Sequence, residues 1–201
     1  GPDHSSARIE RYLQLAAQDN MWIVQPSTPA NHFHMLRTQA YKRPRKPLIA
    51  FTPKQLLRLS AASSHIEEFT SGGFQPIIGD TTITDPASVT RVLLCSGRLY
   101  YDLAKEREHR GDTSTAIIRL EQLYPLPEAE LAEVLAQYPN ASVTWVQDEP
   151  RNQGAWPHLA LNLFPSLGRP VRMVSRPESA TTAAGRASLH KEQAATLIAQ
   201  A

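Results

Sequence analysis

The sequence has a single cysteine among its 201 residues, and this scarcity excludes two classes of protein. One thiol cannot form an intrachain disulfide, and it cannot provide the paired CxxC ligands of a structural zinc site. The cysteine, Cys95, lies in the apolar run VLLCSG, which is typical of a buried strand. We therefore expect a structural thiol in a chain suited to the reducing cytoplasm.

Long apolar runs and the common cofactor motifs are also missing. No stretch approaches the roughly 20 apolar residues that a transmembrane helix requires, and no signal peptide is visible. The chain lacks GxGxxG, the P-loop pattern, GxSxG and HExxH. The sequence thus has no signature of a membrane protein, a nucleotide-binding enzyme, an α/β-hydrolase or a zinc protease.

The composition is that of a folded globular chain, with 41% hydrophobic and 20% charged residues. Its charge is uneven, because residues 1–60 contain nine Lys/Arg against three Asp/Glu, and residues 61–201 contain twelve against sixteen. This asymmetry indicates two regions with different neighbours. The basic segment YKRPRKP, residues 41–47, is interrupted by prolines and has no aromatic platform. We interpret it as a solvated loop or intersubunit rim, not as a nucleic-acid site.

The first 60 residues predict a helix and then a strand–helix–strand unit. Helix-capping residue types at Asp3, Ser5 and Ser6 precede apolar residues at helical spacing from Ile9, which predicts an amphipathic helix of about four turns. Further predictions are strands over 21–25 and 47–52, and between them a helix with Thr28 as cap, Pro29 at its first position and an apolar stripe of Phe33, Leu36 and Ala40.

A strand–helix–strand unit of this length implies a parallel pair of strands. Parallel sheets are buried on both faces, so this unit cannot form a complete domain. Residues 1–60 therefore need strands that the chain does not supply before them. We expect the chain to be a piece of a larger protein.

The second region predicts a more complete α/β alternation. Residues 61–87 are rich in Ser, Gly, Thr and Asp, and we interpret them as a linker with a short helix near 64–70. Residues 88–201 then predict a small doubly wound α/β domain. Its strands are expected at 89–96, 115–123, 142–150 and 170–175, with helices over 99–110, near 125–140 and at the C-terminal end.

Two segments carry candidate functional residues. His4 lies at a helix start beside two serines, where an imidazole can bind an anion or move a proton; an exposed capping histidine is the alternative. The other histidines have no partner at metal-ligand spacing. QDEPRNQGAWP, 147–157, follows a strand at the sheet edge where α/β proteins bind ligands. Its alternative interpretation is a domain-interface loop anchored by a buried Trp156.

Six strings in this order resemble one family and cover most of the chain. They are GPDHSSARIERYLQL, PSTPANHFHMLR, PLIAFTPKQLLR, LCSGRLYYDL, IIRLEQLYPLP and QDEPRNQGAW. The chain resembles the C-terminal part of the thiamine-diphosphate-dependent first component of the 2-oxoglutarate dehydrogenase complex. The resemblance implies that residues 1–60 end a pyrimidine-binding (transketolase-like) domain and that 88–201 form a transketolase C-terminal-like domain, with 61–87 between them.

The resemblance also implies an activity, cofactors and partners. The whole enzyme would decarboxylate 2-oxoglutarate on thiamine diphosphate with Mg²⁺ and pass the succinyl group to lipoyl groups in the tricarboxylic acid cycle. Both cofactors would be bound mainly outside this chain, so the isolated fragment is expected to be inactive. The implied partners are a second copy in a homodimer, the dihydrolipoyl succinyltransferase and the dihydrolipoyl dehydrogenase, in the cytoplasm, with no nucleic acid and no membrane.

By position, His4 matches the family's substrate-facing histidine in GP[DE]HSS, so the resemblance implies that His4 and Ser5 contact 2-oxoglutarate. No cofactor or metal ligand is carried over to this chain. Two other readings stay open at this stage. One is a non-catalytic assembly or regulatory module of such a complex, and the other is a related decarboxylase of a different 2-oxo acid.

Overall fold

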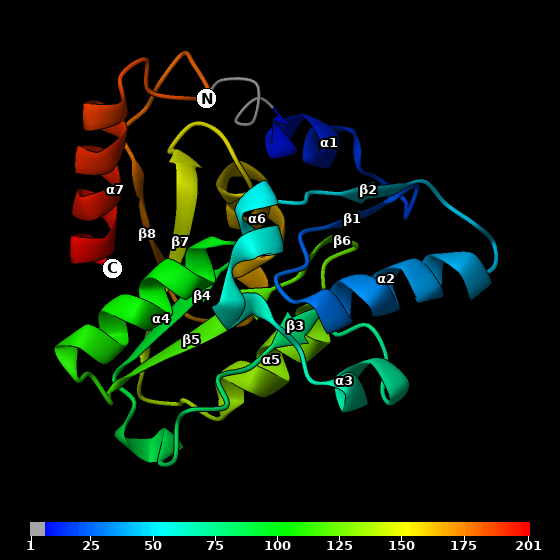
Figure 1. Ribbon diagram of the computed structural model, residues 1–201, viewed down its shortest axis with the longest axis horizontal. Helices are drawn as coiled ribbons and strands as arrows, with labels where there is room; N and C mark the ends of the chain where they lie inside the picture. The colour runs from blue at the N-terminus through cyan, green and yellow to red at the C-terminus, as the bar shows by residue number, and fades with distance from the viewer. Residues whose placement is uncertain (1–6) are drawn as a thin grey trace.

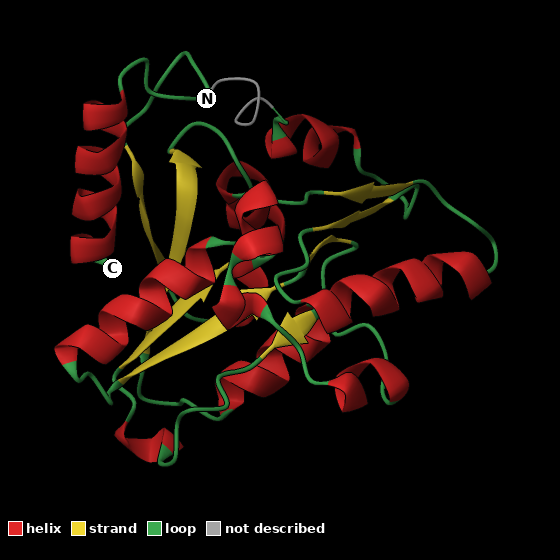
Figure 2. Ribbon diagram, in the orientation of Figure 1, coloured by secondary structure: helices red, strands yellow, loops and turns green. Residues whose placement is uncertain are grey.

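The computed structural model describes residues 7–201, so His4 and Ser5 lie outside the described residues. Two sheets organise the chain: a small sheet of order β2-β1-β6 and a larger one of order β3-β5-β4-β7-β8 (Figures 1 and 2). The strands are β1 (Trp22–Val24), β2 (Leu48–Ala50), β3 (Ile77–Ile78), β4 (Arg91–Cys95), β5 (Thr115–Leu120), β6 (Gln122–Tyr124), β7 (Ser142–Pro150) and β8 (Val171–Arg176). The α-helices are α1 (Ile9–Leu15), α2 (Pro29–Tyr41), α3 (Ile66–Thr70), α4 (Leu99–Arg110), α5 (Glu128–Ala136), α6 (Trp156–Asn162) and α7 (Ala187–Gln200).

The strand–helix–strand unit is confirmed, because β1 and β2 pair in parallel with Trp22 opposite Leu48. The other edge of β1 is covered by β6, which pairs with it in the antiparallel direction and comes from the second region of the chain. Residues 1–60 therefore do not complete a sheet alone, as expected. The source of the third strand was not foreseen, since the predicted strand over 115–123 breaks at Glu121 and its last part joins the small sheet.

The first helix is shorter than predicted and has a different cap. α1 has seven residues, about two turns instead of four, and its N-cap is Arg8, in a left-handed conformation and with no side-chain cap bond. The structure places the N-cap at Arg8, and the predicted capping residues Asp3, Ser5 and Ser6 lie outside the described residues. The helix ends because Ala16 is extended and the next turn includes Gln18 and Asp19 at positive φ.

The second helix begins as predicted, with Pro29 at its first position and the Thr28 hydroxyl accepting a hydrogen bond from Asn31 N at 3.2 Å. Its predicted apolar stripe, however, faces solvent and not the core. Phe33 and Leu36 are 42% and 51% exposed, and Ala40 is also exposed. The buried residues of α2 are Ala30, Asn31, His34 and Met35.

Two polar residues occupy the buried face of α2, where the segment before β3 pairs the amide of Asn31 and one ring nitrogen of His34, whose Nδ1 has no partner among residues 7–201. Asn31 Nδ2 donates to the Gln75 carbonyl at 3.0 Å, and Asn31 Oδ1 accepts from Gln75 N at 2.8 Å. His34 Nε2 lies 2.8 Å from the Glu68 carbonyl. A buried polar group with a partner costs little, so these contacts override the apolar pattern.

The larger sheet confirms the doubly wound prediction. β4 is parallel to β5 and β7, β7 is parallel to β8, and only β3 is antiparallel, paired with β5. One core cluster packs α4 and α7 on one face of the sheet, and the other packs α5 and α6 on the opposite face (Figures 1 and 2). The composition of residues 61–87 did not predict β3, although the expected short helix is present as α3.

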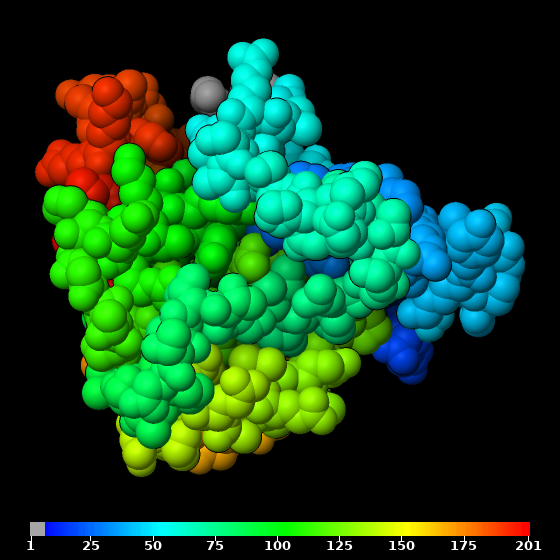
Figure 3. Space-filling model, turned by 60° about the horizontal axis from the view of Figure 1, so that its bottom comes forward, coloured from blue at the N-terminus to red at the C-terminus, as the bar shows by residue number. Residues whose placement is uncertain are grey.

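The basic segment 41–47 is exposed, as predicted, apart from half-buried Lys46, and projects from the molecule at the end of α2 (Figure 3). Cys95 is fully buried in β4, which confirms the structural interpretation of the thiol. No helix of residues 7–201 has the length and hydropathy to cross a membrane.

Candidate functional site

The order of the larger sheet places a crevice between the carboxyl ends of β4 and β7. From β4 the chain passes through α4 to β5 on one side, and from β7 it passes through α6 to β8 on the other side. Such a reversal leaves a gap at the carboxyl ends of two neighbouring strands, and open α/β sheets bind ligands there. The residues that follow β4 and β7 are therefore the first candidates for a site.

A side chain of the first region fills this crevice. The Ser96 hydroxyl, just after β4, donates to Gln25 Oε1 at 2.7 Å. Gly97 has φ +59°, and a β-carbon placed on it would lie 2.6 Å from Gln25 Nε2. Only glycine combines this backbone conformation with so close an approach. The crevice therefore serves as a joint between the two regions of the chain.

A buried carboxyl group fixes the loop that carries Gln25. Glu121 is fully buried, and its Oε2 accepts hydrogen bonds from Ser27 N at 2.7 Å and Asn31 Nδ2 at 3.0 Å. Burial raises the pKa of Glu121, although these hydrogen bonds and Arg119 oppose the rise. Arg119 donates to the Ser27 hydroxyl at 3.1 Å, and the Tyr101 hydroxyl donates to the Ser27 carbonyl at 2.7 Å. These bonds lock the start of α2 against β5 and α4.

A second charged network lies at the end of β7. Asp148 accepts from Arg98 at 3.0 Å and from Arg176 at 2.7 Å, and Arg176 lies 2.8 Å from His190 Nδ1. Burial opposes ionisation of Asp148, but the two guanidinium groups outweigh it and hold the pKa of this carboxyl below its ordinary value. Because Arg176 is buried and its donors are already paired, the network is structural and offers no free anion site.

The loop over 147–156 is organised by one buried amide. Gln147 Nε2 donates to the carbonyls of Gln153 at 2.7 Å and Pro150 at 3.1 Å. Its Oε1 accepts from Trp145 Nε1 and Trp156 N, both at 3.0 Å. All of Gln147's polar atoms point into the loop, so the side chain holds the loop in one conformation.

This loop is an interface, as its alternative interpretation proposed, but the anchor is different. Trp156 is half-buried and packs on Phe164 with ring centroids 5.7 Å apart, whereas the fully buried tryptophan is Trp145 in β7. α6, which starts at Trp156, contacts α1. The expectation of Trp156 as a buried anchor is therefore wrong, and the loop binds the first helix through α6 and through its backbone.

The backbone contact is a hydrogen bond from Gly154 N to Glu10 Oε2, 3.0 Å long. Glu10 is in the first turn of α1. Glu149, near the end of β7, is close enough to Glu10 for the charge of Glu10 to act on it. Burial, the charge of Asp148 and the charge of Glu10 raise the pKa of Glu149 to about 7. Three carboxyl groups therefore meet where α1 rests on the loop.

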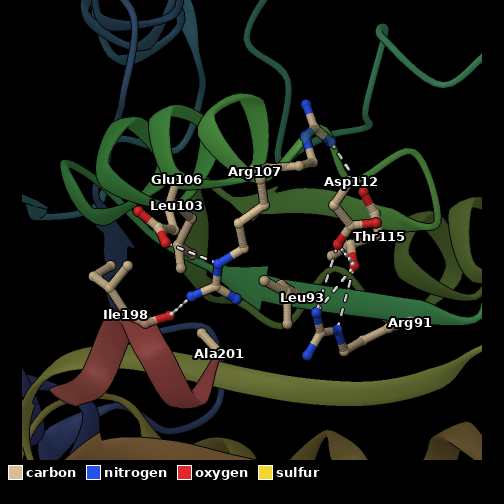
Figure 4. A pocket seen from close by; sticks show the side chains of 10 residues that line it. Arg91, Leu93, Leu103, Glu106, Arg107, Asp112, Thr115, Ile198 and Ala201 are labelled. Atoms are coloured by element: carbon tan, nitrogen blue, oxygen red, sulfur yellow. Dashed lines mark hydrogen bonds and ion pairs between the residues drawn. The ribbon is translucent and has the colours of Figure 1, made fainter. Parts of the chain in front are cut away.

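Two cavities lie elsewhere in the described residues. Figure 4 shows one between α4 and α7 with a volume of about 20 Å³, room for about one water molecule. A second, of about 400 Å³, is lined by residues of the segments 82–88 and 107–113, near the amino ends of β4 and β5. Among residues 7–201 no group of three or more His, Cys, Asp or Glu side chains could hold a metal ion.

Comparison with known proteins first defines the fold. A solved structure described as a split-gene transketolase in an inactive β4 tetramer matches 98% of this chain and 61% of its own, with a TM-score of 0.60 and 15% identity. At this identity the likeness concerns the fold alone. The chain has a transketolase-like α/β fold.

The sequence comparisons then define the family. Residues 63–201 match the model described as 2-oxoglutarate dehydrogenase C-terminal, and residues 1–60 match that of the transketolase pyrimidine binding domain. The chain belongs to the 2-oxoglutarate dehydrogenase C-terminal family, which confirms the resemblance.

Curated relatives match along the whole chain. A 2-oxoglutarate dehydrogenase E1/E2 component of Corynebacterium glutamicum is 50% identical, and an E1 component of Azotobacter vinelandii is 46% identical; each match covers 100% of this chain. A multifunctional 2-oxoglutarate metabolism enzyme of Mycolicibacterium vanbaalenii is 44% identical over the same extent. The matches cover 17%, 22% and 17% of these relatives, so the chain spans about a fifth of their length.

Proposed function

We propose that this chain is part of a thiamine-diphosphate-dependent 2-oxoglutarate dehydrogenase that decarboxylates 2-oxoglutarate and passes the succinyl group to lipoyl groups. The observation that carries the proposal is identity of 43–50% to 2-oxoglutarate dehydrogenase components and multifunctional 2-oxoglutarate metabolism enzymes along nearly the whole chain. The matched model over residues 63–201 supports the same assignment. The reaction would belong to the tricarboxylic acid cycle.

Within this proposal, residues 1–60 form the end of the pyrimidine-binding domain and residues 88–201 form the C-terminal domain. Residues 61–87 are the linker between them. His4 is the catalytic residue of this chain and hydrogen-bonds 2-oxoglutarate, and Ser5 contacts the same substrate. An imidazole suits this role because it can donate to a carboxylate and can exchange a proton near neutral pH. His4 and Ser5 precede α1, so the position of α1 matters for both.

The proposed cofactors are thiamine diphosphate and Mg²⁺, bound mainly by other parts of the enzyme. Thiamine diphosphate supplies the carbanion chemistry of decarboxylation. Since residues 7–201 provide no cluster of metal ligands, no step of the reaction is assigned to a metal held by them. The proposed contribution of this chain is the substrate contact at His4 and the joints that hold the domains together.

The proposed partners are the remainder of the polypeptide, a second copy in a homodimer, and the succinyltransferase and dihydrolipoyl dehydrogenase of the complex, in the cytoplasm. A second candidate function is a non-catalytic assembly module. The filled crevice favours it in part, because Gln25 occupies the place where an α/β sheet usually binds a ligand.

One substitution separates these two candidates. In the full-length protein, His4→Ala should lower the turnover of 2-oxoglutarate by at least about a hundredfold and leave the molecular mass in solution unchanged. Exposed His109, with a side chain 81% exposed, provides the matched control: His109→Ala should leave turnover unchanged. Full activity of His4→Ala would favour the assembly module. Full-length protein that consumes another 2-oxo acid and ignores 2-oxoglutarate would contradict the proposed substrate.

A further inference from the structure

The proposed role of His4 raises the question of what fixes α1, which follows this residue in the chain. α1 buries two side chains, Ile9 and Leu13, in the main core cluster. Apolar contacts are not directional, so they decide which face of α1 is buried but fix its exact placement less sharply than a hydrogen bond does. A directional contact is needed to set the helix in one position.

Glu10 makes that contact. Its Oε2 accepts a hydrogen bond from Gly154 N at 3.0 Å, and in residues 7–201 no other hydrogen bond joins α1 to the second region of the chain. A bond from an amide to a carboxylate is charge-assisted and roughly twice as strong as a neutral one. The Glu10 side chain is 17% exposed, so solvent weakens this bond little.

The donor is held rigidly. Gly154 has φ +71°, and a β-carbon placed on it would lie 2.9 Å from Glu149 Cβ and 3.0 Å from Gln147 Nε2. The same Gln147 amide binds the carbonyl of Gln153, the residue before Gly154. The Gly154 amide is therefore aimed at α1 by the hydrogen bonds that organise the loop.

Retaining a carboxylate at position 10 has an electrostatic cost. The charges of Asp148 and Glu10 both raise the pKa of Glu149, and the cation paired with Glu10 is Arg8, at 3.7 Å. Glu10 Oε1 is buried and has no hydrogen-bond partner among residues 7–201. The hydrogen bond from Gly154 N compensates for these unfavourable surroundings of the Glu10 side chain.

We propose that Glu10 is a positioning residue: through its hydrogen bond to the Gly154 amide it sets α1, the helix that follows His4 in the chain, on the loop after β7. This inference rests on the proposed function of His4. Glu10 touches neither substrate nor cofactor in this proposal. Its effect on the reaction passes through His4 alone.

The test uses the full-length enzyme and four variants. Glu10→Ala should lower kcat/KM for 2-oxoglutarate about tenfold or more, because a displacement of about 1 Å can cost on the order of a hundredfold. Glu10→Gln keeps an acceptor oxygen and should stay within about threefold of the native enzyme. Glu67→Ala, an exposed first-turn glutamate of α3, is the control for the loss of a helix-terminal charge and should match the native enzyme. The fourth variant combines His4→Ala with Glu10→Ala.

The double variant decides whether Glu10 acts through His4. If it does, Glu10→Ala adds no further loss in the His4→Ala background, since coupled residues are not additive. Fully additive losses would overturn the proposal, as would a Glu10→Ala enzyme with native kcat/KM. A lower melting temperature with unchanged kcat/KM per folded enzyme would reduce Glu10 to a structural role and also overturn it. A His4→Ala enzyme with native turnover contradicts the proposed function of His4 itself, which distinguishes the two failures.

Discussion

Gln25 and Gly97 lie so close that a β-carbon at position 97 would force the Gln25 side chain to shift from its contact with Ser96. A β-carbon there would meet three atoms of the Gln25 side chain at 2.6–3.0 Å. The two residues are far apart in the sequence, one after β1 and the other after β4. Their contact joins the small sheet to the larger one at the crevice between β4 and β7.

Gly97→Ala should destabilise the protein more than Gly111→Ala. Both glycines have φ near +60°, but a β-carbon placed on Gly111 would meet no atom within 4 Å. Gly111→Ala therefore costs only the free energy of holding an alanine in the left-handed conformation, roughly 1–2 kcal/mol. Gly97→Ala adds a steric clash of roughly 1–3 kcal/mol. Urea unfolding followed by tryptophan fluorescence measures the difference.

Gln25→Ala in the Gly97→Ala background is the control for this contact. The shortened side chain removes the clashing atoms, so the double variant should recover part of the lost stability. Equal losses for Gly97→Ala and Gly111→Ala would mean that the joint tolerates a methyl group.

Glu149→Gln should make the protein more stable at pH 8 and change its stability little at pH 5. The folded-state pKa of Glu149 is raised to about 7, above the ordinary value of 4.5. The protonated form is favoured in the folded state, so the stability present below about pH 4.5 is lost as the pH rises to about 7. The glutamine side chain of the variant cannot ionise, and the gain at pH 8 should reach at most about 3 kcal/mol.

Thermal melts of both proteins between pH 5 and 8 measure this effect. Glu67→Gln, at an exposed position, should follow the native protein throughout the range. Glu10→Gln should give a smaller gain in stability at pH 8, because the charge of Glu10 contributes to the raised pKa of Glu149. A constant difference between Glu149→Gln and the native protein across this range would contradict the predicted titration.

Asp148→Asn should lower stability by about 1–2 kcal/mol, because it leaves the buried Arg176 without its counter-charge, while solvent at the 36% exposed Asp148 side chain reduces the loss. The folded-state pKa of Asp148 is depressed, so its contribution is present above about pH 4 and is lost as the pH falls through the folded value. Urea titrations at pH 7 and pH 3 measure both parts.

Asp102→Asn is the matched control for Asp148. Asp102 also pairs with Arg98, but its side chain is 44% exposed, and it does not contact Arg176. Its substitution should cost less than about 1 kcal/mol. If the two substitutions cost the same, Arg176 does not depend on Asp148.

Cys95 should react with Ellman's reagent only when the protein unfolds. The thiol is fully buried, and burial raises its pKa to about 12, so the reactive thiolate is scarce in the folded protein at pH 8. The labelling rate should increase with urea along the unfolding curve measured by fluorescence. Rapid labelling without denaturant would show that β4 opens locally.

Local signals in the chain were sufficient to predict many of the elements. Thr28 and Pro29 mark the start of α2, the glycine after Arg110 marks the end of α4, and apolar runs mark β4, β7 and β8. The order of strands and helices was enough to predict a doubly wound sheet. The strings that resemble the family are local too, and the comparisons confirmed them.

Contacts between distant segments controlled the rest of the fold. Composition did not predict β3, the break at Glu121 or the transfer of β6 to the small sheet, since each depends on pairing with residues far along the chain. The buried face of α2 was decided by Asn31 and His34, which find backbone partners near α3 and β3. The contacts of Glu10 with Gly154 and of Gln25 with Gly97 likewise have no sequence signal, because hydrogen bonds and close approaches between distant residues exist only once the chain has folded.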